Sequence, residues 1–358
     1  MNKTINDFLT YYINKFYLHK MKVKNNISYY QIYITHLCSE ACRHCYLKEE
    51  KIKDPTTQEI MNTLNNIINN NNLIKKNIVI DLIGGDPLLR NDIFEILDFL
   101  KNNNINYGIK GNPQLIIKYK DILKDFKLQR YQLSLDGLEQ THDSIRSNGS
   151  FKETISAIKI LNQLHIPVFL KYTVFKENIE EIPLLLNYLY DNNLIIAGFS
   201  TSRYYEKDLE KTLSKNEMKY FMEKSFNSYV DLYTKQIENK KINISIVFKE
   251  HLWYPFLYKK GYILNETHNI LSKNFPFSIT CSMLSENCHI IEIDGSFGLC
   301  PKIDKINLTN HTLEKYKKNL KEISCADCIF KKVCLGCPAF YNINNIDFTC
   351  FLYTKGDS

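Results

Sequence analysis

Apolar residues follow two different spacings along roughly the first 200 residues of the chain. Short apolar and aromatic runs typical of β-strands lie at residues 29–35, 77–83, 105–109, 131–135, 168–174 and 194–199. Between these runs the apolar residues recur every three or four positions, which predicts helices at 56–70, 92–101, 113–124, 151–164 and 179–191. Alternating strands and helices favour a parallel sheet with helical crossovers. We therefore expect an α/β fold, a partial (βα)6 barrel of the TIM type, because six units are too few for a closed eightfold barrel.

The pattern changes after Arg203. A long amphipathic helix is predicted at 215–239 and a strand at 242–248, followed by an aromatic stretch around Trp253. At the other end, residues 5–21 predict one helix at most, with packing as its expected role. We expect four regions, which are an N-terminal helical extension (1–28), the partial barrel (29–240), a linker (241–280) and a cysteine-rich domain (281–358).

Composition and charge exclude several classes of protein. The content of hydrophobic residues is 44% and that of charged residues is 24%, as in ordinary globular proteins. No apolar run is long enough for a membrane span, and the N-terminus lacks the apolar centre of a signal peptide, so we expect a cytoplasmic protein and no membrane partner. The net charge of +7 comes from lysines spread along the chain, so we expect no nucleic-acid partner.

The cysteines indicate metal binding. There are eleven, three between residues 38 and 45 and eight between 281 and 350. Disulfides are not expected in the cytoplasm, and the number is odd. Tight groups separated by a long gap are typical of metal ligands.

The first group follows the first predicted strand and has the spacing C-x3-C-x2-C, with Cys38, Cys42 and Cys45. Three thiolates this close together can hold a [4Fe–4S] core and leave one of its four irons open. Loops at the carboxyl ends of parallel strands are also where such folds place catalysis. On the spacing alone, a zinc knuckle or incidental cysteines remain alternatives.

Together with the turn Gly84-Gly85-Asp86-Pro87 after the second strand, this motif resembles the radical S-adenosylmethionine (SAM) superfamily. The resemblance implies that the open iron binds the amino and carboxylate groups of SAM. It also implies that the glycine-rich turn presents backbone groups to the amino end of SAM, where a side chain would block the approach. Asp86 occupies a position where the family usually has Glu.

Four further residues carry the resemblance. His44 precedes the third cysteine, at a position where the family usually has an aromatic residue near the adenine. Ser134 and Asp136 after the fourth strand, with Arg146 further on, resemble the segment that binds the carboxylate and ribose of SAM. An ordinary turn followed by a surface arginine is the alternative. Lys110-Gly111-Asn112 matches only loosely the Thr-Asn-Gly turn of the family.

The second group of cysteines resembles the twin-cluster auxiliary domain called SPASM. Its pattern includes Gly295-x4-Cys300 and Cys325-x2-Cys328-x5-Cys334-x2-Cys337, where the last gap is one residue shorter than usual. The resemblance implies one auxiliary [4Fe–4S] cluster held by Cys281, Cys288, Cys300 and Cys337. It implies a second held by Cys325, Cys328, Cys334 and Cys350. The short gap leaves open to which set Cys337 belongs, and a zinc ribbon is the alternative for the central motif alone.

The resemblance implies an oxygen-sensitive enzyme with three [4Fe–4S] clusters and SAM as cofactors. The SAM-binding cluster would cleave SAM reductively to methionine and a 5′-deoxyadenosyl radical, which takes a hydrogen atom from the substrate. The expected substrate is a ribosomally made peptide that is oxidatively crosslinked, and the expected electron donor is a flavodoxin or ferredoxin. Any leader-binding module would be a separate protein, or the leader binds the barrel directly.

Three alternative functions remain. Anaerobic sulfatase-maturing enzymes, which form formylglycine from Cys or Ser, carry an Asp directly after the cysteine of the GX4C motif, whereas Pro301 follows Cys300 here. Small-molecule oxidation is another alternative, and a non-catalytic zinc or electron-transfer protein is the most distant. No catalytic base is assigned. Candidate substrate contacts are Arg203, Tyr204 and Tyr205 after the sixth strand, and Trp253 and Tyr254, for which core packing is an equal alternative.

Overall fold

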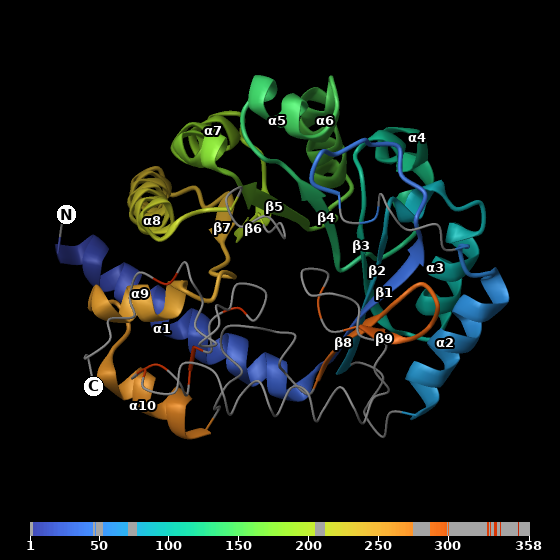
Figure 1. Ribbon diagram of the computed structural model, residues 1–358, viewed down its shortest axis with the longest axis horizontal. Helices are drawn as coiled ribbons and strands as arrows, with labels where there is room; N and C mark the ends of the chain where they lie inside the picture. The colour runs from blue at the N-terminus through green and yellow to red at the C-terminus, as the bar shows by residue number, and fades with distance from the viewer. Residues whose placement is uncertain are drawn as a thin grey trace.

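The computed structural model describes residues 3–45, 47, 53–70, 77–204, 212–274, 287–298, 300, 328, 330, 333–334, 337 and 350. Within these residues, nine strands form one curved sheet in the order β7-β6-β5-β4-β3-β2-β1-β8-β9 (Figure 1). The strands are β1 Ser28–Thr35, β2 Ile78–Gly84, β3 Asn106–Lys110, β4 Arg130–Ser134, β5 Val168–Val174, β6 Ile196–Arg203, β7 Ile244–Ile246, β8 Cys288–Ile291 and β9 Phe297–Gly298. Neighbouring strands are parallel from β7 to β8, and β9 is antiparallel to β8.

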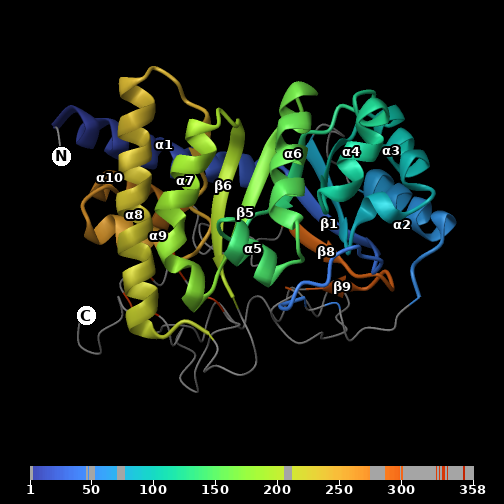
Figure 2. The same cartoon turned by 90° about the horizontal axis from the view of Figure 1, so that it is seen from above.

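Helices cover the outer side of this curved sheet (Figures 1 and 2). They are α2 Thr57–Asn70, α3 Ile93–Asn102, α4 Gln114–Leu123, α5 Glu139–Ile145, α6 Ser150–Gln163, α7 Ile182–Asp191 and α8 Lys215–Glu238, with short 3-10 turns η2 Pro87–Leu89 and η3 Lys176–Glu181. The predicted α/β alternation and the parallel sheet are confirmed for all six units. The short helix α5, which positions Arg146, was not predicted.

Local signals explain where some helices begin. At the start of α2, the backbone N–H of Thr56 donates to Glu59 Oε2 at 2.7 Å, and the backbone N–H of Glu59 donates to Thr56 Oγ1 at 3.3 Å. This reciprocal pair satisfies two backbone donors that the first turn of a helix leaves free. Ser214 and Glu217 form the same arrangement at the start of α8.

Strands β7 and β8 extend the sheet at both edges. The sequence analysis placed residues 242–248 in a linker and Cys288 in the cysteine-rich region. In the structure β7 pairs with β6, and β8 pairs with β1 so that Cys288 lies opposite Tyr29. An edge strand presents unpaired backbone groups, and an apolar segment from a distant part of the chain can satisfy them. Chain segments far beyond the six units therefore belong to the same sheet.

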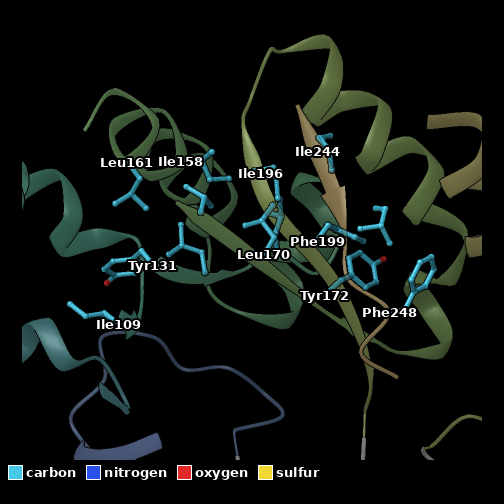
Figure 3. Close-up of a cluster of buried hydrophobic side chains, with 14 of the residues drawn as sticks. Ile109, Tyr131, Ile158, Leu161, Leu170, Tyr172, Ile196, Phe199, Ile244 and Phe248 are labelled. Atoms are coloured by element: carbon cyan, nitrogen blue, oxygen red, sulfur yellow. The ribbon is translucent and has the colours of Figure 1, made fainter. Parts of the chain in front are cut away.

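The hydrophobic core lies between the sheet and its outer helices. Figure 3 shows Leu170 and Ile196 from the strands packed toward Ile158 and Leu161 of α6, and all four side chains are at most 1% exposed. Because side chains alternate across a strand, the residues next to these core positions face the other side of the sheet. That side carries polar side chains from five strands, namely Gln31, Lys110, Gln132, Lys171 and Ser200. The inner side of the sheet is thus suited to polar chemistry.

Helix α1 Lys3–Asn26 packs against α9 Trp253–Lys259 and α10 Asn265–Asn274 on the open side of the sheet (Figure 1). The rings of Tyr17 and Tyr254 meet edge to face at 5.1 Å, and Asn14 Nδ2 donates to the carbonyl of Tyr262 at 2.7 Å. Trp253 is completely buried between Tyr229 and other aromatic rings. The packing role predicted for the N-terminal helix is confirmed, and core packing is also the role of Trp253 and Tyr254. Of the helices in the described part of the chain, none combines the length and the apolar character that a bilayer crossing requires.

A buried carboxylate organises the inner side of the sheet. Asp81 on β2 is fully buried and accepts two hydrogen bonds from Arg130, at 2.9 Å each, while Lys110 Nζ lies at 3.3 Å. Burial alone would raise the pKa of Asp81, but the charges of Lys110 and Arg130 outweigh burial and hold this pKa below its usual value. The carboxylate therefore stays ionised and links β2, β3 and β4.

We expect Asp81→Asn to lower the free energy of unfolding by about 2 kcal/mol, because an amide leaves Lys110 and Arg130 without their counter-charge. The loss should be below that of a fully buried pair, since both cations keep partial contact with solvent. Denaturant unfolding under anaerobic conditions measures it. Asp98→Asn, on the exposed face of α3, is the matched control and should change stability by less than about 0.5 kcal/mol. Equal stability of the two variants would contradict the assignment.

Candidate active site

The three N-terminal cysteines lie on the loop that follows β1. Cys42 is 6% exposed, Cys45 is half-buried and Cys38 is exposed. The backbone N–H of Cys45 donates to the carbonyl of Cys42 at 3.2 Å, which turns the loop back on itself. The backbone N–H of Arg43 donates to the carbonyl of Ile145 at 3.0 Å and so fixes the loop to the end of α5.

The glycine-rich bend after β2 touches this loop directly. The backbone N–H of Gly85 donates to the carbonyl of Thr35 at 3.0 Å, and that of Asp86 donates to the carbonyl of Leu37 at 2.7 Å. A Cβ on Gly85 would lie 2.1 Å from the carbonyl oxygen of Leu37, and one on Gly84 would lie 2.1 Å from that of Thr35. The close approach of two backbones is therefore sufficient reason for both glycines. Access of SAM to the bend, the reason offered by the sequence analysis, stays a prediction.

Asp86 is completely buried behind the bend. Its Oδ1 accepts from the backbone N–H of Leu88 at 3.2 Å and caps η2, while Oδ2 has no hydrogen-bond partner among the described residues. Burial raises the pKa of Asp86 to about 7, so the carboxyl is easily protonated. Pro87 is buried beside it as the first residue of η2. Whether these residues contact SAM stays a prediction.

Two donors point at cysteine sulfurs. Asn112 Nδ2, just after β3, donates to Cys38 Sγ at 3.1 Å, and Arg146 Nη1 donates to Cys42 Sγ at 3.5 Å. Burial raises the pKa of Cys42 to about 12, although the Arg146 charge opposes this shift. A coordinated metal deprotonates a thiol outright, and both donors would then stabilise a thiolate. The Lys110-Gly111-Asn112 turn, a loose match in sequence, is thus brought to the cysteine loop.

Asp136 and Arg146 form one unit. Asp136 is fully buried, and its carboxylate accepts from Arg146 Nε at 2.7 Å and from the backbone N–H of Thr173 at 2.6 Å. Both oxygens are therefore engaged, and Asp136 acts here by positioning Arg146. Ser134 lies half-buried at the end of β4. Contact of these three residues with SAM stays a prediction.

His44 belongs to a group of aromatic rings beside the loop. Its ring centroid lies 5.2 Å from that of Phe175 and 6.2 Å from that of Tyr204, and Phe175 and Tyr204 are 4.7 Å apart. Burial, together with the positive charge of Arg146, lowers the pKa of His44 to about 3. The imidazole is therefore neutral and behaves as an aromatic ring, as the resemblance implies for this position.

The candidate substrate residues at the end of β6 lie in two different surroundings. Arg203 is 1% exposed, and its Nη2 lies 3.1 Å from Glu250 Oε1 and 3.2 Å from His251 Nε2. Arg203 is therefore part of the interior in this structure, whereas Tyr204 lies in the aromatic group with His44. Tyr205 lies outside the described residues.

Six of the eight C-terminal cysteines are described, and Cys281 and Cys325 lie outside the described residues. Cys288 is buried in β8, and Cys334 is buried with its thiol 3.8 Å from the carbonyl oxygen of His251. The remaining four are half-buried, namely Cys300, Cys328, Cys337 and Cys350. The assignment of these cysteines to two auxiliary clusters stays a prediction.

One carboxylate at the cysteine loop was missed by the sequence analysis. The Glu40 side chain is 3% exposed, accepts from Ser150 Oγ at 2.7 Å, and lies 4.0 Å from Arg146 Nη1. Cys42 Sγ donates to its Oε2 at 3.4 Å. The only signal in the sequence was its position between the first two cysteines, where an acidic residue also fits an exposed loop.

The residues of the loop fit a [4Fe–4S] cluster. Three thiols lie on one short loop, and amide and guanidinium donors point at two of them. Hydrogen bonds to sulfur are among the features by which proteins adjust such clusters. In the described part of the chain, no three His, Cys, Asp or Glu side chains surround a single point as the ligands of one metal ion would. A cluster binds its cysteines at separate irons, so they need not share such a point.

Residues 32–189 match the profile of the radical SAM superfamily. This segment contains the cysteine loop, the glycine-rich bend, Asp136 and Arg146, and it ends within α7. Residues 32–189, with their fold and their site, are thus similar to a radical SAM domain. A [4Fe–4S] cluster and SAM are the cofactors that this match implies.

Proteins with differently named activities are similar in sequence to part of this chain. An AdoMet-dependent heme synthase of Methanosarcina barkeri is 30% identical over 151 residues, which are 40% of this chain and 42% of that protein. The antilisterial bacteriocin subtilosin biosynthesis protein AlbA of Bacillus subtilis is 29% identical over 155 residues, which are 42% of this chain and 34% of AlbA. The matched segments thus span less than half of either relative.

The fold extends further than these sequence matches. Crystal structures of Streptococcus suis SuiB superpose with a TM-score of 0.64 over 90% of this chain and about three quarters of SuiB, at 18% identity. SuiB is bound to S-adenosylmethionine in one of them and to the precursor peptide SuiA in another. At this identity the likeness shows a shared fold.

We expect Gly85→Ala to remove most of the iron bound by the cysteine loop, because the new Cβ would displace the backbone at Leu37, next to Cys38. Iron analysis and the SAM-responsive electron paramagnetic resonance (EPR) signal of anaerobically prepared protein measure the loss. Gly261→Ala is the control, since its φ of +79° also disfavours a side chain but its Cβ would meet no atom within 4 Å. It should cost about 1 kcal/mol and keep the iron. Full iron content in Gly85→Ala protein would show that the contact is not needed.

Proposed function

We propose that this chain is a radical SAM enzyme that cleaves SAM reductively at a cluster held by Cys38, Cys42 and Cys45 and oxidatively modifies a ribosomally made peptide. One observation carries the first half of the proposal, which is the backbone contact between the cysteine loop and the Gly84–Pro87 bend. It places the two motifs of the superfamily side by side. The bound cluster and SAM would supply the radical chemistry.

The residues of the site have separate tasks in this proposal. Asn112 and Arg146 donate to thiolate sulfurs, and Asp136 holds Arg146 in position. His44 presents a neutral ring to the adenine of SAM. Gly84 and Gly85 allow the bend to lie against the loop, and the bend presents backbone groups to the amino end of the cosubstrate. Ser134, at the end of β4, contacts the ribose side.

Two observations support a peptide as the substrate. The relative AlbA is named for the biosynthesis of a bacteriocin, and SuiB, which shares the fold, binds a precursor peptide. The eight C-terminal cysteines, in the arrangement typical of peptide-modifying relatives, support two auxiliary clusters that accept an electron from the substrate radical. We propose a crosslink as the product and a flavodoxin or ferredoxin as the electron donor.

A second candidate is the modification of a tetrapyrrole. An AdoMet-dependent heme synthase and an Fe-coproporphyrin III synthase, both of Methanosarcina barkeri, are among the relatives. The alignment with the heme synthase covers 40% of this chain, and that with the coproporphyrin synthase covers 63%. The extent of these matches makes a porphyrin the substrate to test beside a peptide. Formylglycine formation stays an alternative. The structure of anSMEcpe with bound AdoMet shares the fold at a TM-score of 0.64 over 91% of this chain and 94% of that chain, at 15% identity. Residues 301–304, on which the sequence comparison rests, lie outside the described residues.

We expect Cys42→Ala to abolish 5′-deoxyadenosine formation, since two thiols cannot hold the SAM-binding cluster. Its iron content should fall from about twelve to about eight atoms per chain, as one of three clusters is lost. Liquid chromatography of reactions with SAM and a reductant, together with iron analysis, tests both statements. Cys334→Ala, in the C-terminal group, should keep SAM cleavage. Undiminished cleavage by Cys42→Ala protein would refute the assignment of the site.

The substrate is tested by mass spectrometry of two parallel reactions. One contains peptides encoded by short genes next to the gene for this chain, and the other contains Fe-coproporphyrin III. A peptide that loses two hydrogen atoms in a reaction dependent on SAM and on Cys42 supports the proposal. A mass change in the porphyrin while every peptide stays unchanged would replace the peptide by the second candidate.

A further inference from the structure

Five residues form a closed ring of contacts beside the Cys42 thiol, which Arg146 and Glu40 touch. Arg146 Nε donates to Asp136 Oδ2 at 2.7 Å, and the backbone N–H of Asp136 donates to His142 Nδ1 at 3.0 Å. His142 Nε2 lies 3.2 Å from Ser150 Oγ, which donates to Glu40 Oε1 at 2.7 Å. Glu40 Oε2 then faces Arg146 Nη1 at 4.0 Å and closes the ring. The ring therefore joins the cysteine loop to the end of β4, to α5 and to α6.

The direction of each hydrogen bond in the ring is set by its chemistry. A backbone N–H can only donate, so His142 Nδ1 is an acceptor and the proton of a neutral ring lies on Nε2. Burial lowers the pKa of His142, which keeps the ring neutral. His142 therefore donates to Ser150, and the serine hydroxyl has its own proton for Glu40. Each bond orients the next, and the last one fixes the Glu40 carboxylate.

The charges of the ring do not balance. It contains two carboxylates, Glu40 and Asp136, and one guanidinium, Arg146, all at most 11% exposed as side chains. A cysteine thiolate at Cys42 adds another negative charge to the same place. Cations that lie further out are partly engaged elsewhere, as Arg43 is with Glu177 and with the ring of Phe175. Buried charge of one sign is costly, and it disfavours the addition of an electron nearby.

Glu40 is the member of the ring that a simple loop anchor would not require. Ser39 Oγ donates to Gln114 Oε1 at 3.2 Å and accepts from Asn112 Nδ2 at 3.2 Å, and the backbone of Arg43 is held by Ile145. Gln114 Nε2 also donates to Glu40 Oε1, at the longer distance of 3.4 Å. The loop is thus attached to the sheet and helices on both sides of Cys42. The loop would stay attached without Glu40. What Glu40 adds is a negative charge within hydrogen-bond distance of the Cys42 thiol.

Resting on the proposed function, we propose that Glu40 sets the reduction potential of the SAM-binding cluster by the negative charge that it places beside Cys42. Its carboxylate, oriented by Ser150 and His142, lies 3.4 Å from the Cys42 sulfur and lowers the potential by its own charge. A low potential is what reductive cleavage of a sulfonium requires of the cluster. Hydrogen bonding and net charge near the sulfurs are the terms by which proteins shift such potentials.

The test is a redox titration of the intact protein, monitored by the EPR signal that changes when SAM is added. Glu40→Gln keeps an acceptor for Ser150 and removes the charge. Its midpoint potential should rise by an amount equal to at least a tenfold change in the reduction equilibrium, about 59 mV for one electron. Ser150→Ala keeps the charge and removes a donor that compensates it, so its midpoint should fall. Glu153→Gln, a carboxylate that Gln114 contacts at 2.8 Å, makes the same charge change outside the ring and should leave the midpoint unchanged.

The signs of these shifts separate the outcomes. Opposite shifts for Glu40→Gln and Ser150→Ala support the proposal, because a loop that is merely loosened would shift both variants alike. Shifts of one sign, an unchanged midpoint in Glu40→Gln, or an equal shift in Glu153→Gln overturn it. If Glu40→Gln protein does not load the cluster, Ser150→Ala decides alone, and any result other than a fall overturns the proposal. Wild-type protein without a SAM-responsive signal would instead contradict the proposed function.

Discussion

Two backbone hydrogen bonds between the ends of β1 and β2 set the geometry on which the site depends. They join Gly85 to Thr35 and Asp86 to Leu37, at a separation that leaves no room for a Cβ at Gly84 or Gly85. Arg90 also stabilises the end of β1, since its Nη1 donates to the carbonyl of Ile34 at 2.7 Å. Parallel strands end at the same edge of a sheet, so residues beyond β3 and β4 reach this point as well. The cysteine loop is therefore built on backbone contacts and approached by side chains from later strands.

The curved sheet separates two environments around that point. Its outer side is covered by helices and is apolar, while its inner side carries charged and polar side chains around Asp81. The buried ion pairs cost desolvation energy, and their partners from β2, β3 and β4 also fix the relative positions of these strands. The same ion pairs therefore contribute to the stability of the sheet and make its inner side charged.

Local patterns predicted the six β/α units well, because side-chain period and capping act within a few residues. They could not place β8 beside β1, since edge pairing joins segments about 260 residues apart and leaves no periodic signal. The same holds within the site. Spacing alone singled out Cys38, Cys42 and Cys45 as candidate ligands, whereas Glu40 is buried against Ser150, which is 110 residues away. The sequence analysis expected glycine at position 85 for the access of SAM, whereas the contact with Leu37 that excludes a Cβ there is visible only in three dimensions.

The distribution of the site along the chain bears on substrate choice. The superfamily match ends at residue 189, after the cysteine loop, the bend and Arg146, and relatives with differently named products share parts of the chain. Strands β6 and β7 and helices α8 to α10 lie beyond the end of that match. Tyr204 marks the junction, because it belongs to the later part and yet packs against Phe175 beside His44. The aromatic group is therefore a direct contact between the cysteine loop and the part of the chain beyond the family match.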